Sequence, residues 1–89
     1  MKALKLKHYS DPGHGWVAVK RGFIEALGLA GVISEYSFQK GQTVYLEEDR
    51  DANIVLNALK ATGVEVSIES KSTKSIRSYP RYKKPQGAF

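Results

Sequence analysis

Hydrophobic and polar residues alternate at the start of the chain in the pattern of a β-strand with one face in water. Leu4 and Leu6 alternate with lysines in the segment MKALKLKHY, and a period of two is typical of a half-buried strand. The segment GWVAVKR that follows is rich in β-forming residues, with Val17 and Val19 on one face and Trp16 on the other. Because the intervening SDPGHG is too long for a two-residue turn, we expect a hairpin with an extended loop.

The period changes to that of a helix after Arg21 and then returns to that of strands. In GFIEALGLAGVI the apolar residues Phe23, Ile24 and Leu27 recur at helical spacing, and Gly28 can end a short helix. The segments EYSF and TVYLEE are separated by the polar, glycine-containing QKGQ. This arrangement predicts a second hairpin.

The segment DRDANIVLNALKATG contains the clearest helical pattern of the chain. Val55 and Leu59 lie on the face that we expect to be buried. Asp49 or Asp51 can cap the beginning of this helix, and Gly63 can end it.

The last regular segment, VEVSIES, predicts a strand with Val64, Val66 and Ile68 directed inward. The predicted order is β-β-α-β-β-α-β. A two-layer α+β sandwich, with two helices on one face of a mainly antiparallel sheet, buries these apolar stripes. We therefore predict a single α+β domain over residues 1–69 and a C-terminal tail or extension over residues 70–89.

Composition narrows the classes of protein to which the chain can belong. With 89 residues and 42% hydrophobic residues, it is long enough for one modest core. It has no cysteine, which excludes disulfides, thiolate zinc sites and cysteine nucleophiles. The opening residues contain no apolar run of the length that signal peptides or membrane spans need. We therefore expect a cytoplasmic protein without a membrane partner.

The net charge of +5 is concentrated at the end of the chain. Up to Glu69 the chain has eight lysines and arginines against nine acids, whereas the remainder has six basic residues and no acid. These six are Lys71, Lys74, Arg77, Arg81, Lys83 and Lys84. Basic arms commonly contact nucleic acid, and Tyr79 and Tyr82 could stack on bases. The alternative is a solvated end whose lysines only aid solubility.

The segment HYSDPGHGW contains both histidines of the chain. Histidine and aspartate are common metal ligands and general bases, and His8, Ser10, Asp11 and His14 lie close together in sequence. However, the proline and glycines between them loosen the geometry that a metal site or a Ser-His-Asp arrangement requires. Catalysis and metal binding are therefore the weaker interpretations of this segment.

Two other interpretations of the same segment depend on its glycines. In the architectural one, Gly13 and Gly15 provide a positive φ or a close approach, and Trp16 fills one end of the core. In the other, the glycines leave backbone N–H groups open to a ligand toward which His14 points. Both interpretations stay open at the level of sequence.

Four acids in the segment LEEDRD form a second candidate cluster. Paired carboxylates can bind Mg²⁺, but acids before a helix also stabilise its positive end, which accounts for Asp49 and Asp51. Consecutive strand residues point to opposite faces, so at most one of Glu47 and Glu48 lies on a wet face if the strand continues to that point.

Aromatic residues mark the predicted second hairpin. Tyr36, Phe38 and Tyr45 are best explained as cross-strand packing pairs. An exposed stacking platform for nucleic acid is the alternative, although the aromatic-basic signatures of such platforms are absent.

Several segments together resemble a widespread set of short, uncharacterised proteins encoded by bacteriophages. They are DPGHGWVAV, YSFQKG, VYLEEDRDA and IRSYPRY, and DPGHGW and YLEEDRDA are the most specific. The similarity extends from His8 to Tyr82. Since no activity is established for that set, it assigns no functional residue. It implies an accessory protein that acts by binding in the host cytoplasm.

Three hypotheses about function follow. The first is a non-enzymatic phage protein, without cofactor or metal, that counteracts host defence or metabolism by capturing a nucleotide-like, phosphate-bearing ligand or by blocking a host protein. Its predicted ligand contacts are Gly13, His14, Gly15, Trp16, Arg77, Tyr79, Arg81 and Tyr82. The second is a nucleic-acid-binding protein that uses the basic aromatic tail, and the third is a small hydrolase that uses His14. The sequence leaves homo-oligomer formation open.

Overall fold

The computed structural model describes residues 3–72 and 76–84, which form five strands, two α-helices and one 3₁₀ turn. The elements are β1 (Ala3–Asp11), β2 (His14–Lys20), α1 (Arg21–Ala26), β3 (Phe38–Lys40), β4 (Thr43–Glu47), α2 (Asp51–Ala61), β5 (Glu65–Ser72) and η1 (Ile76–Ser78). The predicted order of strands and helices is confirmed.

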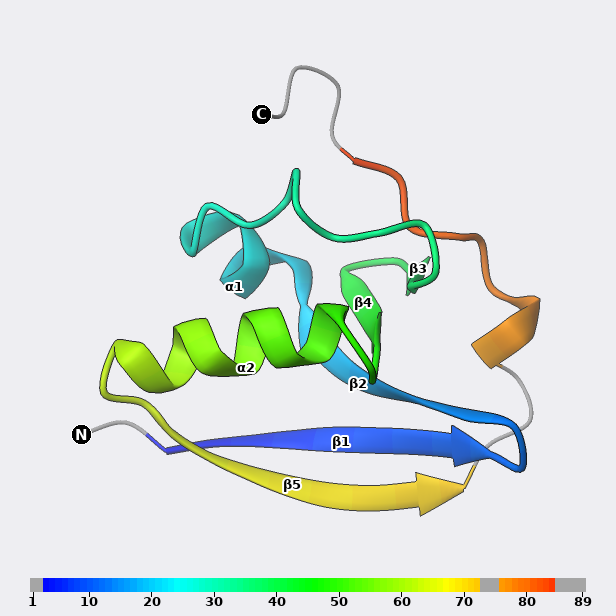
Figure 1. Cartoon of the computed structure of the whole chain (residues 1–89), viewed down its shortest axis with the longest axis horizontal. Helices are drawn as coiled ribbons and strands as arrows, with labels where there is room; N and C mark the ends of the chain where they lie inside the picture. Colours follow the sequence, from blue (N-terminus) through cyan, green and yellow to red (C-terminus); the bar gives the residue numbers. More distant parts are fainter. Residues whose placement is uncertain (1–2, 73–75, 85–89) are drawn as a thin grey trace.

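The five strands form one sheet in the order β3-β4-β2-β1-β5 (Figure 1). Only β1 and β5 pair in parallel, and the other three pairs are antiparallel. Side chains of both helices pack into one core against the same face of the sheet. The predicted class, an α+β sandwich on a mainly antiparallel sheet, is therefore confirmed.

The connection between β1 and β2 is shorter than predicted. Asp11 pairs directly with His14, so only Pro12 and Gly13 form the turn. The Asp11 carboxylate accepts the backbone N–H groups of Gly13 at 2.8 Å and His14 at 2.9 Å, an Asx arrangement that stabilises a tight turn. The expectation of an extended loop is wrong because this side chain lets both strands continue to the turn.

The main core lies between the sheet and the helices. Its buried members are Leu6, Val17, Val19, Ile24, Ile33, Val44, Leu46, Ala52, Val55, Leu59 and Tyr82. Val55 and Leu59 thus occupy the predicted buried stripe of α2, which ends before Gly63 at a φ of +89°. The prediction that Ile68 is directed inward is wrong, because this residue is 46% exposed. It lies on β5, which is an edge strand of the sheet.

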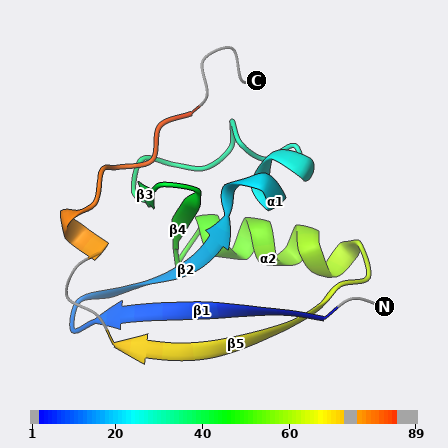
Figure 2. The same cartoon turned by 180° about the vertical axis from the view of Figure 1, so that it is seen from behind.

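A second, smaller cluster covers part of the opposite face of the sheet. It contains Trp16, Phe38 and Ile76, and partly buried tyrosines surround it. The segment 76–84 runs from the β1–β2 turn past β3, as both views show (Figures 1 and 2). Ile76 thus fixes the C-terminal segment to the face of the sheet that the helices leave open.

Backbone hydrogen bonds then attach this segment to the edge of the sheet. The N–H of Gln39 donates to Pro80 O and the N–H of Tyr82 donates to Ser37 O, both at 2.8 Å. The expected tail therefore packs onto the domain over residues 76–82, and the domain boundary placed at residue 69 falls within β5. Residues 73–75 and 85–89 of the expected tail lie outside the described residues.

A buried carboxylate joins the beginning of α2 to the loop before β3. Asp51 has no exposed surface, and its Oδ2 accepts Ser34 Oγ–H at 2.6 Å, Ser34 N–H at 3.1 Å and Ser37 Oγ–H at 2.5 Å. Its Oδ1 accepts the Arg50 guanidinium at 2.7 Å. The prediction that Asp49 or Asp51 caps the helix is wrong. The N-cap residue is Arg50, and no side-chain cap hydrogen bond forms there. The Asp51 carboxylate instead accepts the hydroxyl groups of Ser34 and Ser37.

Loss of this carboxylate leaves several buried donors without an acceptor. We predict that Asp51→Ala lowers the free energy of unfolding by about 3 kcal/mol, measured by urea denaturation. The exposed Asp49→Ala is the matched control and changes it by less than about 0.5 kcal/mol. Equal losses in the two variants would contradict this role for Asp51.

Candidate functional site

A pocket of about 370 Å³ opens on the helix-free face, between the β1–β2 turn and the C-terminal segment. We call it the turn pocket. It is lined by His14, Trp16, Tyr36, Phe38, Glu47, Arg77 and Arg81. These residues come from β2, β3, β4, the loop before β3 and the segment after β5.

Four of the predicted contact residues meet in the turn pocket, although they are up to 67 positions apart in the sequence. His14 and Trp16 lie on the same face of β2, and their rings are in edge contact with centroids 5.4 Å apart. The guanidinium of Arg77 lies over the Trp16 ring at 5.2 Å from its centroid, and that of Arg81 lies over the Phe38 ring at 5.4 Å. Residues of β2 and residues of the segment after β5 therefore line the same pocket.

The two predicted tyrosines serve packing. Tyr82 is buried in the main core, and its hydroxyl donates to Ala30 O at 2.6 Å. Tyr79 packs against Tyr45 with ring centroids 5.1 Å apart, and the Lys40 ammonium lies 4.7 Å above its ring. Neither residue lines the turn pocket. Since Tyr82 is buried, its ring is not available for stacking on a ligand.

The two predicted glycines shape the backbone beside the turn pocket. Neither has a positive φ, so that part of the expectation is wrong. The close approach is found at Gly15, where a Cβ would lie 2.6 Å from His8 Nε2 and would also strike the Glu48 carboxylate. At Gly13 a Cβ would meet only the Arg77 Nη2 atom at 3.1 Å and the Asp11 carboxylate.

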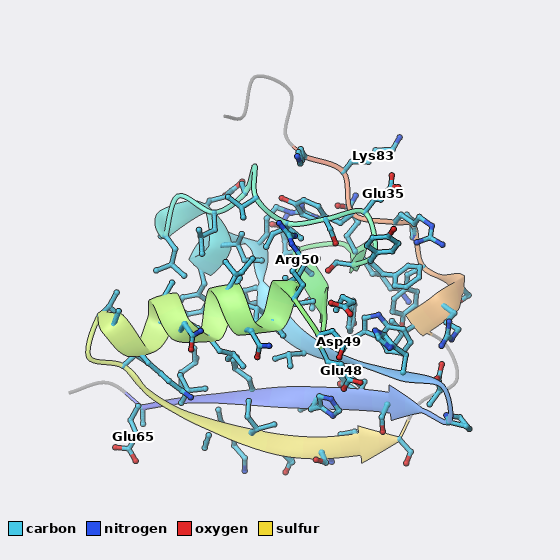
Figure 3. All side chains as sticks on the ribbon, viewed as in Figure 1. Glu35, Glu48, Asp49, Arg50, Glu65 and Lys83 are labelled. Carbon is cyan, nitrogen blue, oxygen red and sulfur yellow. The ribbon has the colours of Figure 1, made fainter. Side chains whose placement is uncertain are left out.

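The gap left by Gly15 is filled by a histidine–glutamate pair. His8 Nε2 lies 3.0 Å from Glu48 Oε2, at hydrogen-bond distance. Figure 3 shows Glu48 next to Asp49 where the chain enters α2. Glu47 instead bonds His14 in the turn pocket. The two glutamates thus bond different histidines and do not form a carboxylate pair, with Glu47 the last residue of β4 and Glu48 just beyond it.

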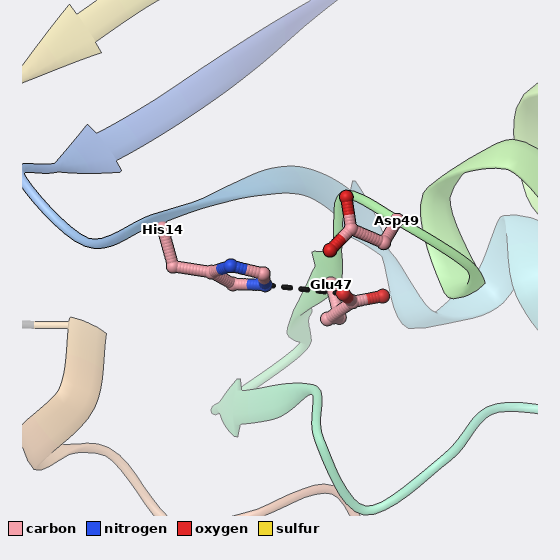
Figure 4. Close-up of side chains that lie close together, drawn as sticks. All are labelled: His14, Glu47 and Asp49. Atoms are coloured by element: carbon pink, nitrogen blue, oxygen red, sulfur yellow. Dashed lines mark hydrogen bonds and ion pairs between the residues drawn. The ribbon is translucent and has the colours of Figure 1, made fainter.

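His14 lies beside two carboxylates (Figure 4). Its Nε2 is 3.1 Å from Glu47 Oε2, and one ligand atom each from His14, Glu47 and Asp49 lie within 4.8 Å of one another. One imidazole nitrogen and two carboxylate oxygens are a donor set that divalent metals accept. Glu47 is already held by His14 and by the Arg50 N–H, which donates to its Oε1 at 2.8 Å. Hydrogen bonds within the protein therefore account for the positions of His14 and Glu47, and Asp49 is the exposed member of the group.

The two arginines of the turn pocket differ in whether a carboxylate neutralises their positive charge. Arg77 forms a forked ion pair with Asp11, with Nε–Oδ2 at 2.6 Å and Nη2–Oδ1 at 3.3 Å. The hydrogen bond from Arg77 lowers the pKa of Asp11 to about 2, and Asp11 in turn raises the pKa of Arg77. Arg81 donates to the backbone oxygen of Glu35 at 3.1 Å and pairs with no carboxylate among the described residues. Arg81 is therefore the stronger site for an incoming anion.

Trp16, one of the residues that line the turn pocket, has a buried indole N–H without a partner among the described residues. Its residue is 1% exposed, and its indole N–H has no hydrogen-bond acceptor within the part of the chain that the structure describes. A buried N–H without a partner is destabilising and is usually paired in folded proteins.

Three lining residues were not among the predicted contacts. Phe38 and Glu47 were considered as a packing aromatic and as a possible acid, and both depend on long-range strand pairing for their position. Tyr36 lies exposed in the turn before β3. The prediction that Tyr36 is a cross-strand packing residue is therefore wrong, because it is 67% exposed and lies outside β3.

The pKa of Asp11 reports directly on its contact with Arg77. We predict that Arg77→Gln raises this pKa from about 2 toward the ordinary 3.8, measured by carboxyl ¹³C NMR. It should remain somewhat below 3.8 because two backbone N–H groups still donate to Asp11. A folded-state pKa below the unfolded one stabilises the fold above pH 3.8, and this contribution is lost as the pH falls toward 2.

The control for this titration is Arg81→Gln, which removes the same charge from the same pocket without touching Asp11. It should leave the pKa of Asp11 near 2. An unchanged pKa in Arg77→Gln would show that the forked ion pair does not form.

No helix in the described ranges, 3–72 and 76–84, is long and apolar enough to cross a membrane. Comparisons of the chain with protein-family models, curated proteins and solved structures gave no match. Its function is therefore inferred from the geometry of its own residues.

Proposed function

We propose that this protein binds a phosphate-bearing, nucleotide-like ligand in the turn pocket and acts by capturing it, without catalysis. The observation that carries the proposal is the meeting of His14 and Trp16 with Arg77 and Arg81 around one hollow. A contact surface for a host protein does not require such convergence, whereas a small ligand does.

The chemistry of the lining supports an anionic ligand with a planar group. Arg81 offers charge-assisted hydrogen bonds without a competing carboxylate among its described neighbours, and phosphate oxygens accept such bonds well. The exposed ring of Tyr36 and the ring of Phe38 offer surfaces for a planar base. The Glu47 carboxylate offers an acceptor for the N–H groups of that base.

The setting of this capture is the host cytoplasm, in line with the resemblance to short phage proteins. Removal of a nucleotide that signals or feeds a host process would counteract host defence or metabolism. In this account His14 orients Glu47 and contacts the ligand, and it has no role as a hydrolytic base.

The test is an NMR titration of ¹⁵N-labelled protein with inorganic phosphate and with nucleoside mono-, di- and triphosphates. We expect a nucleotide to shift the Trp16 indole N–H and the His14 amide. Arg81→Gln should weaken the binding at least about tenfold, because it removes a charge-assisted contact.

Lys83→Gln is the matched control, since it removes one positive charge from an exposed residue two positions away. It should leave the affinity nearly unchanged. The proposal fails if no probe shifts the turn-pocket signals at millimolar concentration, or if both variants weaken binding equally.

A further inference from the structure

A second hollow, of about 400 Å³, lies over β1, β2 and β4, away from the turn pocket. We call it the sheet-face groove. Its lining is Leu4, Lys5, Leu6, Lys7, Tyr9, Ala18, Val19, Lys20, Phe23, Thr43 and Tyr45. Of these residues, the sequence analysis considered only Tyr45 as a possible contact with nucleic acid, and none of them lines the turn pocket.

The groove exists because the centre of this face carries a small side chain. Ala18 pairs with Lys7 on one side and with Tyr45 on the other, so these three side chains share one face of the sheet. Tyr9 and Tyr45 meet edge to face at one end, with ring centroids 5.9 Å apart. Phe23, at the groove, is 41% exposed, although it is a large apolar residue. The result is a shallow floor bordered by aromatic rings.

All charged side chains that line the groove are positive. Three of the lining residues are lysines, and none of the described lining residues is acidic. Lys5 lies 3.6 Å from Glu69, an exposed carboxylate that also lies 3.6 Å from Lys71. Lys7 and Lys20 have no ion pair among the described residues. Lys5 and Lys7 are about 7 Å apart along β1, as alternate residues of a strand are.

We propose that the sheet-face groove binds single-stranded nucleic acid. The lysines would neutralise successive phosphates, and the exposed ring of Phe23 and the ring of Tyr9 at the end of the groove would receive unpaired bases by stacking, the combination that single-strand binding proteins use. In a duplex the bases are already paired and stacked inside, so they are not available to stack on these rings.

This assignment differs from binding through the C-terminal tail. The segment 76–82 uses its aromatic residues for packing, since Tyr82 is buried and Tyr79 lies against Tyr45 and under Lys40. Arg77 is paired with Asp11. The groove instead keeps two lysines without ion pairs and an exposed aromatic ring together on one surface.

The test is fluorescence anisotropy with a labelled single-stranded oligonucleotide of about twelve nucleotides, a length that one small domain can cover. The triple variant Lys5→Gln, Lys7→Gln, Lys20→Gln should weaken binding at least about tenfold at low salt. It should also reduce the slope of log affinity against log salt by about 2, since each phosphate contact contributes about 0.7.

Lys60→Gln, Lys83→Gln, Lys84→Gln is the matched control, because it removes the same charge from α2 and the C-terminal segment. It should retain nearly full affinity. Ala18→Leu fills the groove without changing charge and should also weaken binding in protein whose circular dichroism and melting temperature show that it is folded. Arg81→Gln should bind the oligonucleotide normally, which separates this proposal from the turn pocket.

Three results would overturn the proposal. They are no binding of the oligonucleotide by the natural protein, equal loss in the two triple variants, and tighter binding of a duplex of the same length. Binding to vesicles of anionic lipid without binding to the oligonucleotide would likewise assign the groove to a membrane surface instead.

Discussion

Trp16 has to be buried on a face of the sheet that neither helix covers. Strand alternation places it opposite Val17 and Val19, whose side chains belong to the main core. An indole of this size buries a large apolar area, and leaving it in water would forfeit a substantial part of the stability of a small domain. The C-terminal segment provides the cover through Ile76, with Arg77 over the indole ring.

The turn pocket is a consequence of the way in which the C-terminal segment covers Trp16. The segment that buries Trp16 must also pass the β1–β2 turn and the edge of β3. In doing so it brings two arginines next to His14 and Glu47. Ser37 supports this path, since its hydroxyl bonds Asp51 while its backbone oxygen accepts the Tyr82 N–H. The buried carboxylate before α2 is therefore coupled to the segment that completes the pocket. The rest of the same face, where the segment does not reach, remains open as the sheet-face groove.

The sequence predicts the elements that have a local periodic pattern. It does not predict features whose position depends on residues far away in the chain. The alternation at Leu4 and Leu6 and the helical spacing at Val55 and Leu59 are periodic, so these elements are predicted correctly. The strand predicted over EYSF is instead β3, Phe38–Lys40, and shares only Phe38 with the prediction. Ile68 has the same alternation but lies on an edge strand, and a pattern does not report how far a helix extends over a sheet. Asp11, Pro12 and Gly13 are typical turn residues, but the sequence does not show that the Asp11 carboxylate lets both strands run up to the turn.

The candidate site shows the same division. His14, Trp16, Arg77 and Arg81 were predicted from unusual residue types and from charge, and the structure places them together. Tyr82 was misjudged because a basic, polar neighbourhood in sequence conceals a buried position. Its burial depends on contacts with Ser37 and Ala30, about fifty positions earlier. Separations of this length lie beyond any window over which periodicity is read.

Amide hydrogen exchange measured residue by residue tests most directly whether the C-terminal segment is folded onto the sheet. The N–H groups of Gln39 and Tyr82 bond across the junction between β3 and this segment. We predict that both are protected from exchange to a degree approaching that of Val44 in the central core, because they open only when the domain itself opens. Exchange of both amides at the rate of an unstructured peptide, with Val44 still protected, would show that the segment is detached. Trp16 would then be uncovered, and the turn pocket would not exist.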